Sequence, residues 1–282
     1  MKSFLWLPLF FLLPTVACAD NAWQYSKQIE RSMTVTGTIE VNRDGSVRGY
    51  TLDQQEKLLP EVVEIIGKVA PTWKFEPFSS PNRSFSATTT MSIRVVADKL
   101  DGDRYGLYVR GVSFKDDDPA DGITYRVRSL PRYPREALQA GVGGTVYLVA
   151  SINRQGTVDH VVAQQVNLRA LGDKDAMARL RKDFSQASID AAKKWTFNVP
   201  ASAKPGDSHW DVQIPVNFSV LAKGEKQPEL EYGQWEPYVP GPLQPIPWEQ
   251  DHVADGNNAD AIPGDGVFTP DKRFALLTPL SD

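Results

Sequence analysis

Residues 144–158 read GTVYLVASINRQGTV, and this stretch decides the fold. Every second residue from Val146 to Ile152 is apolar and alternates with residues that can face outward. This period of two is typical of a half-buried antiparallel strand. The segment from Asn153 to Gly156 is typical of a hairpin turn, with Gly156 at the position that needs a positive φ. The stretch therefore predicts two antiparallel strands joined by a tight turn.

An earlier stretch has the same order of residues. Residues 37–47 read GTIEVNRDGSV, so both stretches give Gly-Thr-aliphatic, an alternating strand and then Asn-Arg-x-Gly-small-Val. Gly45 takes the place of Gly156 in the predicted turn. Self-similarity of this kind indicates that one structural unit occurs twice in the chain.

Each copy continues with a helix and one more strand. The helices end in Trp73-Lys74-Phe75 and Trp195-Thr196-Phe197, and alternating strands follow at residues 91–95 and 212–220. An apolar stripe on each helix can cover one face of a sheet. Each copy is therefore predicted to be a small α+β unit, a three-stranded antiparallel sheet with helices packed on one face.

The second copy has further predicted elements. Residues 123–128 alternate like a short strand, and residues 131–134 (PRYP) read as a turn. A short helix is expected from Arg135 to Ala140, ended by Gly141. Apolar residues at helical spacing predict the longer helix over residues 183–195.

The composition is that of a globular protein. The 282 residues are 41% hydrophobic and 23% charged with a formal net charge of −4, which is enough chain for one large or two small domains. These values exclude a wholly disordered or collagen-like chain, and the modest charge argues against a nucleic-acid binder. The single cysteine, Cys18, excludes an intramolecular disulfide framework and a cysteine-based zinc site.

The N-terminus has the pattern of an export signal. Lys2 is followed by an uncharged, apolar run from Phe4 to Ala17, which is too short for a membrane-spanning helix. One interpretation is a signal peptide of residues 1–19. A second is a lipoprotein in which Cys18 becomes the lipidated first residue, and a third is a retained membrane anchor. Under the first two, the protein works outside the cytoplasm.

Composition shifts divide the rest of the chain. We expect a first domain at residues 20–114, a linker at 115–122, a second domain at 123–222 and a tail at 223–282. The tail holds 9 of the 21 prolines, with 11 acidic and 4 basic residues, and is predicted to be extended or disordered. Its aromatic residues are unusual for pure disorder, and the alternative is that they dock on a folded domain or on a partner: Tyr232, Trp235, Tyr238 and Trp248.

Residues 131–220 resemble the C-terminal domain of TonB-type proteins. The resemblance rests on Tyr133-Pro134, Ala137 in the short helix, Gly144-Thr-Val with the following turn, and the Trp195-Thr-Phe motif before the final strand. Residues 33–96 resemble this domain more weakly, as a divergent copy. The resemblance implies two tandem small TonB-C-like domains followed by the Pro-rich extended tail.

The resemblance also implies a place and a partner. Members of the family typically sit in the Gram-negative periplasm and couple inner-membrane proton-motive complexes to outer-membrane transporters. They grip an extended peptide of the transporter by strand addition. An exposed edge of a small antiparallel sheet is suited to this, because edges recruit extended peptides through main-chain hydrogen bonds.

The expected peptide-binding residues lie on the last strand and in the Tyr-Pro motif. They are Tyr133, Pro134, Val212, Gln213, Ile214, Val216, Asn217 and Phe218. Pro215 cannot donate to a strand ladder, so this strand is expected to be an edge or to be irregular there. The alternative is that this strand is an ordinary hairpin edge, which Pro215 protects from pairing with another strand.

The chain departs from the energy-transducing members in two respects. Those members keep an N-terminal transmembrane helix, whereas the apolar segment here is short and broken by Pro8 and Pro14. Leu130 stands where the best-known members carry a glutamine that touches the transporter peptide. These departures argue against force transmission from the inner membrane and leave the expected fold unchanged.

No pattern for catalysis or cofactor binding stands out. His160, His209 and His252 are far apart and lack cysteine partners, so no metal site is expected. The glycines at 141–144 lead into a strand, without the helix N-terminus that a phosphate site needs. We therefore expect a protein that is not an enzyme and takes no cofactor.

The sequence leaves three hypotheses for function. The first is a TonB-like cell-envelope protein that binds extended segments of outer-membrane transporters or other envelope proteins, linked to TonB-dependent transport. The alternative is a periplasmic or lipoprotein scaffold of the same fold with no role in energy transduction. An unrecognised hydrolase is the third. Nucleic acid is not an expected partner, membrane contact is expected only through a lipid anchor, and an edge-paired homodimer is a further option.

Overall fold

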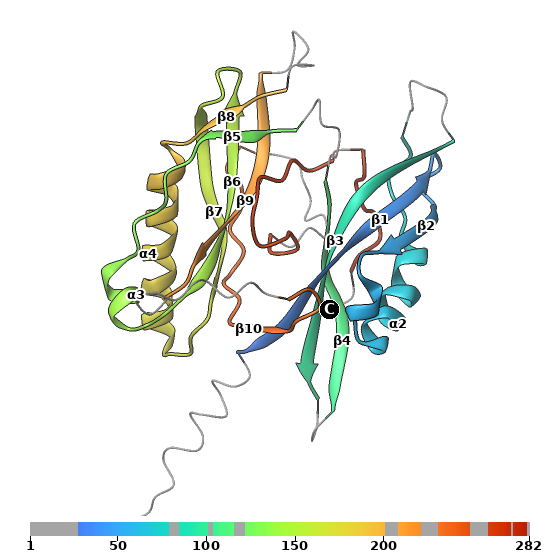
Figure 1. Cartoon of the computed structure of the whole chain (residues 1–282), viewed down its shortest axis with the longest axis horizontal. Coiled ribbons are helices and arrows are strands. Elements are labelled where there is room, and N and C mark those ends of the chain that lie inside the picture. The colour runs from blue at the N-terminus through green and yellow to red at the C-terminus, as the bar shows by residue number, and fades with distance from the viewer. Residues whose placement is uncertain are drawn as a thin grey trace, which may run out of the picture.

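The computed structural model describes residues 28–78, 85–100, 104–115, 122–200, 208–220, 231–248, 259–271 and 273–280. These residues form a mixed α+β structure in which two antiparallel sheets face each other. Helices lie on the outer sides of the two sheets, and the C-terminal part of the chain passes between them (Figure 1). The expected signal peptide, Cys18 and most of the expected linker lie outside the described residues.

The first sheet is built from the N-terminal half of the chain. Strands β1 (Glu30–Asn42), β3 (Ser86–Lys99) and β4 (Tyr105–Lys115) follow one another across it, and β2 (Val47–Leu52) pairs with the outer edge of β1. Apolar residues at every second position point to one face, as the period-two pattern predicts. That core consists largely of Met33, Val35, Ile39, Val41, Met91, Ile93, Val95, Val109 and Val112.

The second sheet has three strands in the order β7-β6-β9. These are β6 (Gly144–Asn153), β7 (Val158–Leu168) and β9 (His209–Phe218), all antiparallel. A two-stranded ladder joins β5 (Thr124–Val127) to β8 (Thr196–Asn198). The central strand β6 differs from the sequence expectation, because Tyr147, Val149 and Ser151 on its second face are also buried. The C-terminal part of the chain covers that face.

Three α-helices occur in the part of the chain that the structure describes. Helix α2 (Pro60–Val69) begins with its proline in the first turn and buries Val62 and Ile66 against the first sheet. Helix α3 (Arg135–Gln139) is one short turn before β6. Helix α4 (Lys174–Ala192) covers the second sheet and is longer at its start than the predicted 183–195. Its N-cap Asp173 accepts two backbone hydrogen bonds, which fixes that earlier start.

The two predicted hairpin turns have the same geometry. Gly45 has a φ of 81° and Gly156 a φ of 76°, so both lie in the left-handed region that favours glycine. The carbonyl of Gly45 accepts from the amide of Phe75, and that of Gly156 accepts from the amide of Phe197. Each turn thus holds the residues after a buried tryptophan, Trp73 or Trp195.

The described residues of the expected tail pack against both sheets. Strand β10 (Glu236–Tyr238) pairs with β1, and Val239 exchanges two backbone hydrogen bonds with Leu168 of β7. Phe274 and Leu276 join the core of the first sheet. The expectation of a disordered segment is therefore wrong for these residues, and docking of its aromatic side chains is what the structure shows. The apolar residues spaced among the prolines supply the contacts that a disordered chain lacks.

Candidate functional site

The predicted binding strand is β9, and its side chains point alternately to two environments. Val212, Ile214, Val216 and Phe218 are at most 3% exposed and lie in the core under α4. Their side chains are therefore enclosed by the protein itself. Gln213 is half-buried and Asn217 is exposed on the other face.

The backbone of β9 has one edge that faces away from β6. The amide and carbonyl of Gln213 both bond to Phe268, at 2.8 and 2.9 Å, so Gln213 does not use them for β6. Backbone direction alternates along an antiparallel strand, so the groups of Asp211, Pro215 and Asn217 face the same way. Pro215 carries no donor, and this edge therefore offers fewer hydrogen bonds than a strand of its length normally does.

The Tyr-Pro motif lies at the C-terminal end of β9. The Tyr133 hydroxyl donates to the carbonyl of Val142 at 2.7 Å, and the Tyr133 ring meets Phe218 edge-on with centroids 5.4 Å apart. Burial raises the pKa of Tyr133. Pro134 is the N-cap of α3. The motif therefore holds α3 against the second sheet, and it brings Tyr133 next to one of the predicted edge residues.

The other edge of this sheet is also covered. Leu168 of β7 exchanges hydrogen bonds of 3.0 and 2.8 Å with Val239, and the amide of Gln244 donates to the carbonyl of Gln164 at 2.7 Å. The Arg181 side chain of α4 donates to the carbonyl of Val166 at 3.2 Å. Both edges of the sheet thus carry segments from the C-terminal part of the chain.

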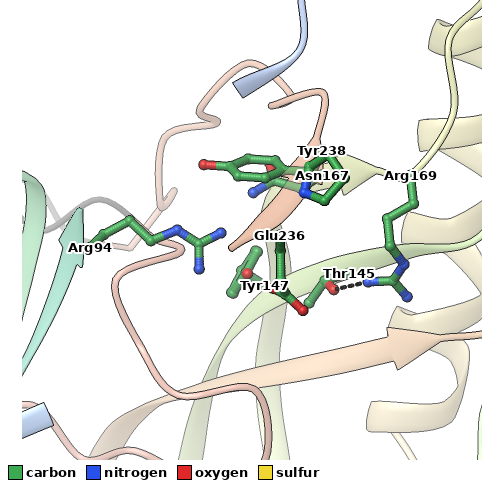
Figure 2. A pocket seen from close by; sticks show the side chains of 8 residues that line it. Arg94, Thr145, Tyr147, Asn167, Arg169, Glu236 and Tyr238 are labelled. Atoms are coloured by element: carbon green, nitrogen blue, oxygen red, sulfur yellow. Dashed lines mark hydrogen bonds between the residues drawn. The ribbon is translucent and has the colours of Figure 1, made fainter. Parts of the chain in front are cut away.

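A small polar pocket lies between the two sheets (Figure 2). Arg94 reaches it from the first sheet, Glu236 and Tyr238 come from β10, Tyr147 comes from β6, and Arg169 directly follows β7. Burial raises the pKa of Tyr147 to about 12, so its hydroxyl is protonated at neutral pH. The cavity volume is about 20 Å³, room for roughly one water molecule, so the pocket does not fit an organic ligand.

A metal site would need a cluster of His, Cys, Asp or Glu side chains. Within the described ranges, no cluster of three His, Cys, Asp or Glu side chains could hold a metal ion. The ring of His209 contacts Ser208 at 3.1 Å and Asp159 at 2.8 Å, but the His209 and Asp159 side chains are 44% and 36% exposed. The hydrogen bond from His209 lowers the pKa of Asp159. This is a surface contact outside the polar pocket.

Sequence reasoning missed the residues that cover β9. Phe268 lies in the short run Val267-Phe268-Thr269, whose strand tendency was hidden by the prolines and acidic residues around it. Asp260 is 3% exposed, although it stands among the acidic residues of the segment expected to be extended or disordered. The buried arginine opposite it, Arg94, alternates with Ile93 and Val95 like an outward-facing residue.

Comparison with known proteins gives a partial match. The chain is similar to TonB over 98 residues. Two relatives, each named Protein TonB and from Xanthomonas campestris pv. campestris strains B100 and ATCC 33913, are 33% identical over this length. The match covers 35% of this chain and 38% of each relative, so the chain spans less than two fifths of their length.

Two further comparisons found nothing. No model of a known protein family matches the chain. No solved structure matches it either. In the part of the chain that the structure describes, none of the helices combines the length and apolar character that crossing a bilayer requires.

Proposed function

We propose that this is a TonB-like protein of the cell envelope that binds an extended segment of an outer-membrane transporter, or of another envelope protein, along the outer edge of β9. The observation that carries the proposal is the pairing of Gln213 with Phe268. A single extended residue already bonds there in strand geometry, so the edge accepts an added strand.

The partial similarity to TonB supports the class of partner. It favours a protein that binds and does not catalyse, and it favours a place in the cell envelope. The export-type N-terminus agrees with such a place, with cleavage after residue 19, lipidation at Cys18 and a retained anchor as the alternatives. The two halves, residues 20–114 and 123–222, would then be two copies of one TonB-C-like module.

The matching geometry of the two turns supports this repeat. Gly45 and Gly156 share a positive φ and the same hydrogen bond to the phenylalanine that follows each buried tryptophan. In this proposal the first module is a companion that carries part of the C-terminal segment. The second module carries the binding edge.

Photo-crosslinking in living cells tests the proposal. A crosslinking amino acid is placed at Asp211 or Asn217 beside the outer edge of β9, and at Gln186 on the exposed side of α4 as the control. We expect the first two positions to capture an outer-membrane transporter or another envelope protein and the control to capture none. Equal capture from all three positions, or none from any, would contradict the proposal.

One observation favours the second candidate function, a scaffold of this fold without a transporter partner. Both edges of the second sheet already pair with the chain's own C-terminal segments. If those contacts are permanent, the sheet has no edge to offer. The experiments below separate this case from the first.

A further inference from the structure

The C-terminal strap, residues 259–271, is the segment that occupies the edge of β9. Its backbone contact with β9 among the described residues is one antiparallel pair, Gln213 with Phe268, and Val267 packs against the core of the second sheet. The Phe268 ring packs beside a small cluster of Tyr147, Ala259 and Ile262. The strap therefore fills the place of an added strand with an aromatic residue opposite Gln213.

On its other side the strap contacts the first sheet. The amide of Asp271 donates to the carbonyl of Phe114 at 2.9 Å, and Pro270 forms a bridge with Lys115 of β4. The Ser113 hydroxyl donates to the carbonyl of Ala261 at 2.7 Å. The strap thus lies between β9 of one sheet and β4 of the other, as Figure 1 shows for the chain between the sheets.

The N-terminal end of the strap is anchored by a buried carboxylate. Asp260 accepts hydrogen bonds from Asn167 at 2.8 Å and from Tyr238 at 3.2 Å. The Arg94 guanidinium lies 3.8 Å from the same carboxylate, and both side chains are about 5% exposed. Removing one partner from such a buried group is strongly unfavourable, so this end is firmly held.

Between its ends the strap contacts the second sheet through Phe268 and the partly buried Val267, and the exposed Asp265 forms an ion pair of 3.4 Å with Arg128. Pro263 and Gly264 follow the anchor, and Gly266 has a φ of 113°. Beyond the strap, Phe274 and Leu276 are buried in the core of the first sheet. The ion pair of Asp265 is exposed and contributes little stability, so the residues around Phe268 can leave β9 while both ends of the segment stay in place.

We propose that the strap is a displaceable internal strand. It occupies the outer edge of β9 in the free protein and is exchanged for an extended segment of the partner. This rests on the proposed function and specifies its ligand as an extended chain with an apolar residue opposite Gln213 and no proline at that position. Binding then requires release of the middle of the strap, so the free protein has a covered edge.

Hydrogen exchange of backbone amides tests displacement without any partner. The amide of Gln213 bonds to the strap, whereas the amides of Val212 and Ile214 face β6. We expect Gln213 to exchange at least tenfold faster than both neighbours in the full-length protein, because it opens with the strap alone. Any smaller ratio overturns the proposal, since the strap would then open only together with the sheet.

Binding of a probe peptide gives a second test. The probe is a labelled peptide of residues 264–271, GDGVFTPD, which is the strap's own sequence. Phe268→Pro removes the amide that donates to Gln213, while the matched control Phe268→Leu keeps that amide and an apolar side chain. We expect the proline variant to bind the probe at least tenfold more tightly than the leucine variant, measured by fluorescence anisotropy. Equal affinity overturns the proposal.

A disulfide lock separates this proposal from the proposed function. Gln213→Cys with Phe268→Cys, in a Cys18→Ser background, joins the strap to β9, because directly opposed antiparallel residues have Cα atoms within disulfide range. We expect the oxidised protein to lose both probe binding and partner capture, and the reduced protein to regain them. Capture that is unchanged by the lock overturns the strap proposal. Absence of capture in both states, with fast Gln213 exchange, rejects only the transporter partner.

Discussion

Replacement of Gly156 by alanine tests the turn on which the second unit is built. An alanine Cβ at this position would lie 2.0 Å from the carbonyl oxygen of Phe197, and the φ of 76° is one that L side chains rarely adopt. The left-handed backbone alone costs roughly 1–2 kcal/mol. Loss of the hydrogen bond between Phe197 and Gly156 costs about 0.5–1.5 kcal/mol more. Alanine also makes the unfolded chain stiffer than glycine does, and this offsets about 0.4–1 kcal/mol of the lost stability.

We therefore expect Gly156→Ala to lower the free energy of unfolding by about 1–3 kcal/mol. Gly45→Ala is expected to do the same, because its Cβ would lie 1.9 Å from the carbonyl oxygen of Phe75. Urea denaturation followed by far-UV circular dichroism measures both. Equal losses of unfolding free energy from the two substitutions are as informative as their size, because they indicate that the two turns contribute equally to stability.

Two matched glycines separate backbone strain from the clash. Gly141 has a φ of 67° with no atom within 4 Å of the added Cβ, so Gly141→Ala should cost only about 1 kcal/mol. Gly49 has neither a positive φ nor a neighbour within 4 Å, and Gly49→Ala should stay within about 0.5 kcal/mol of wild type. A Gly156→Ala protein as stable as Gly49→Ala would refute the reasoning.

Three other substitutions have defined outcomes. Trp195→Phe removes the indole N–H that donates to the carbonyl of Ser129 at 2.7 Å. It should lower the free energy of unfolding by about 1–3 kcal/mol, and an unchanged urea midpoint would contradict this. Asp173→Ala removes the N-cap of α4 and should cost about 1 kcal/mol, measured in the same way, whereas no loss would mean that the cap is dispensable. Burial, opposed by Arg110, raises the pKa of Glu30 above 4.5, so its ionisation costs stability as the pH rises from 4.5 through the folded-state pKa. Glu30→Gln should therefore gain stability relative to wild type between pH 4 and pH 7, and a constant difference over that range would reject the assignment.

The local features of the fold were predictable because they depend on near neighbours. The strand β6, the proline that starts α2 and the glycines of the two turns are each visible within a few residues of sequence. The mixed α+β structure with antiparallel sheets is confirmed. That the two sheets belong to two copies of a TonB-C-like domain stays a prediction, supported by the turns and by the partial similarity to TonB.

The covering of the sheets was not predictable from composition. A proline-rich, acidic segment has the average properties of a disordered chain, yet a few of its residues find specific partners far away in sequence. Asp260 meets Arg94 and Asn167, and Phe268 meets Gln213. Pairing of this kind depends on which surfaces the rest of the fold leaves open, and a local pattern does not contain that information.

The way in which the two edges of the second sheet are covered indicates which of them can serve a partner. On β7, three carbonyls along the outer edge are occupied, because Gln164 accepts from Gln244, Val166 from the Arg181 side chain and Leu168 from Val239. On β9 the described backbone contact with the strap is the one pair at Gln213, and the Trp248 indole donates to the Asp211 side chain at 3.1 Å. An uncovered edge invites unwanted pairing between copies, and so both edges need a cover in the free protein. To bind at β9, an incoming strand has to break the two hydrogen bonds between Gln213 and Phe268, and it can then pair with the neighbouring outward positions of β9. To bind at β7, it has to displace a longer run of contacts first. This difference supports the proposal that β9 is the edge that opens, and that the segment protecting the free protein covers the site of binding.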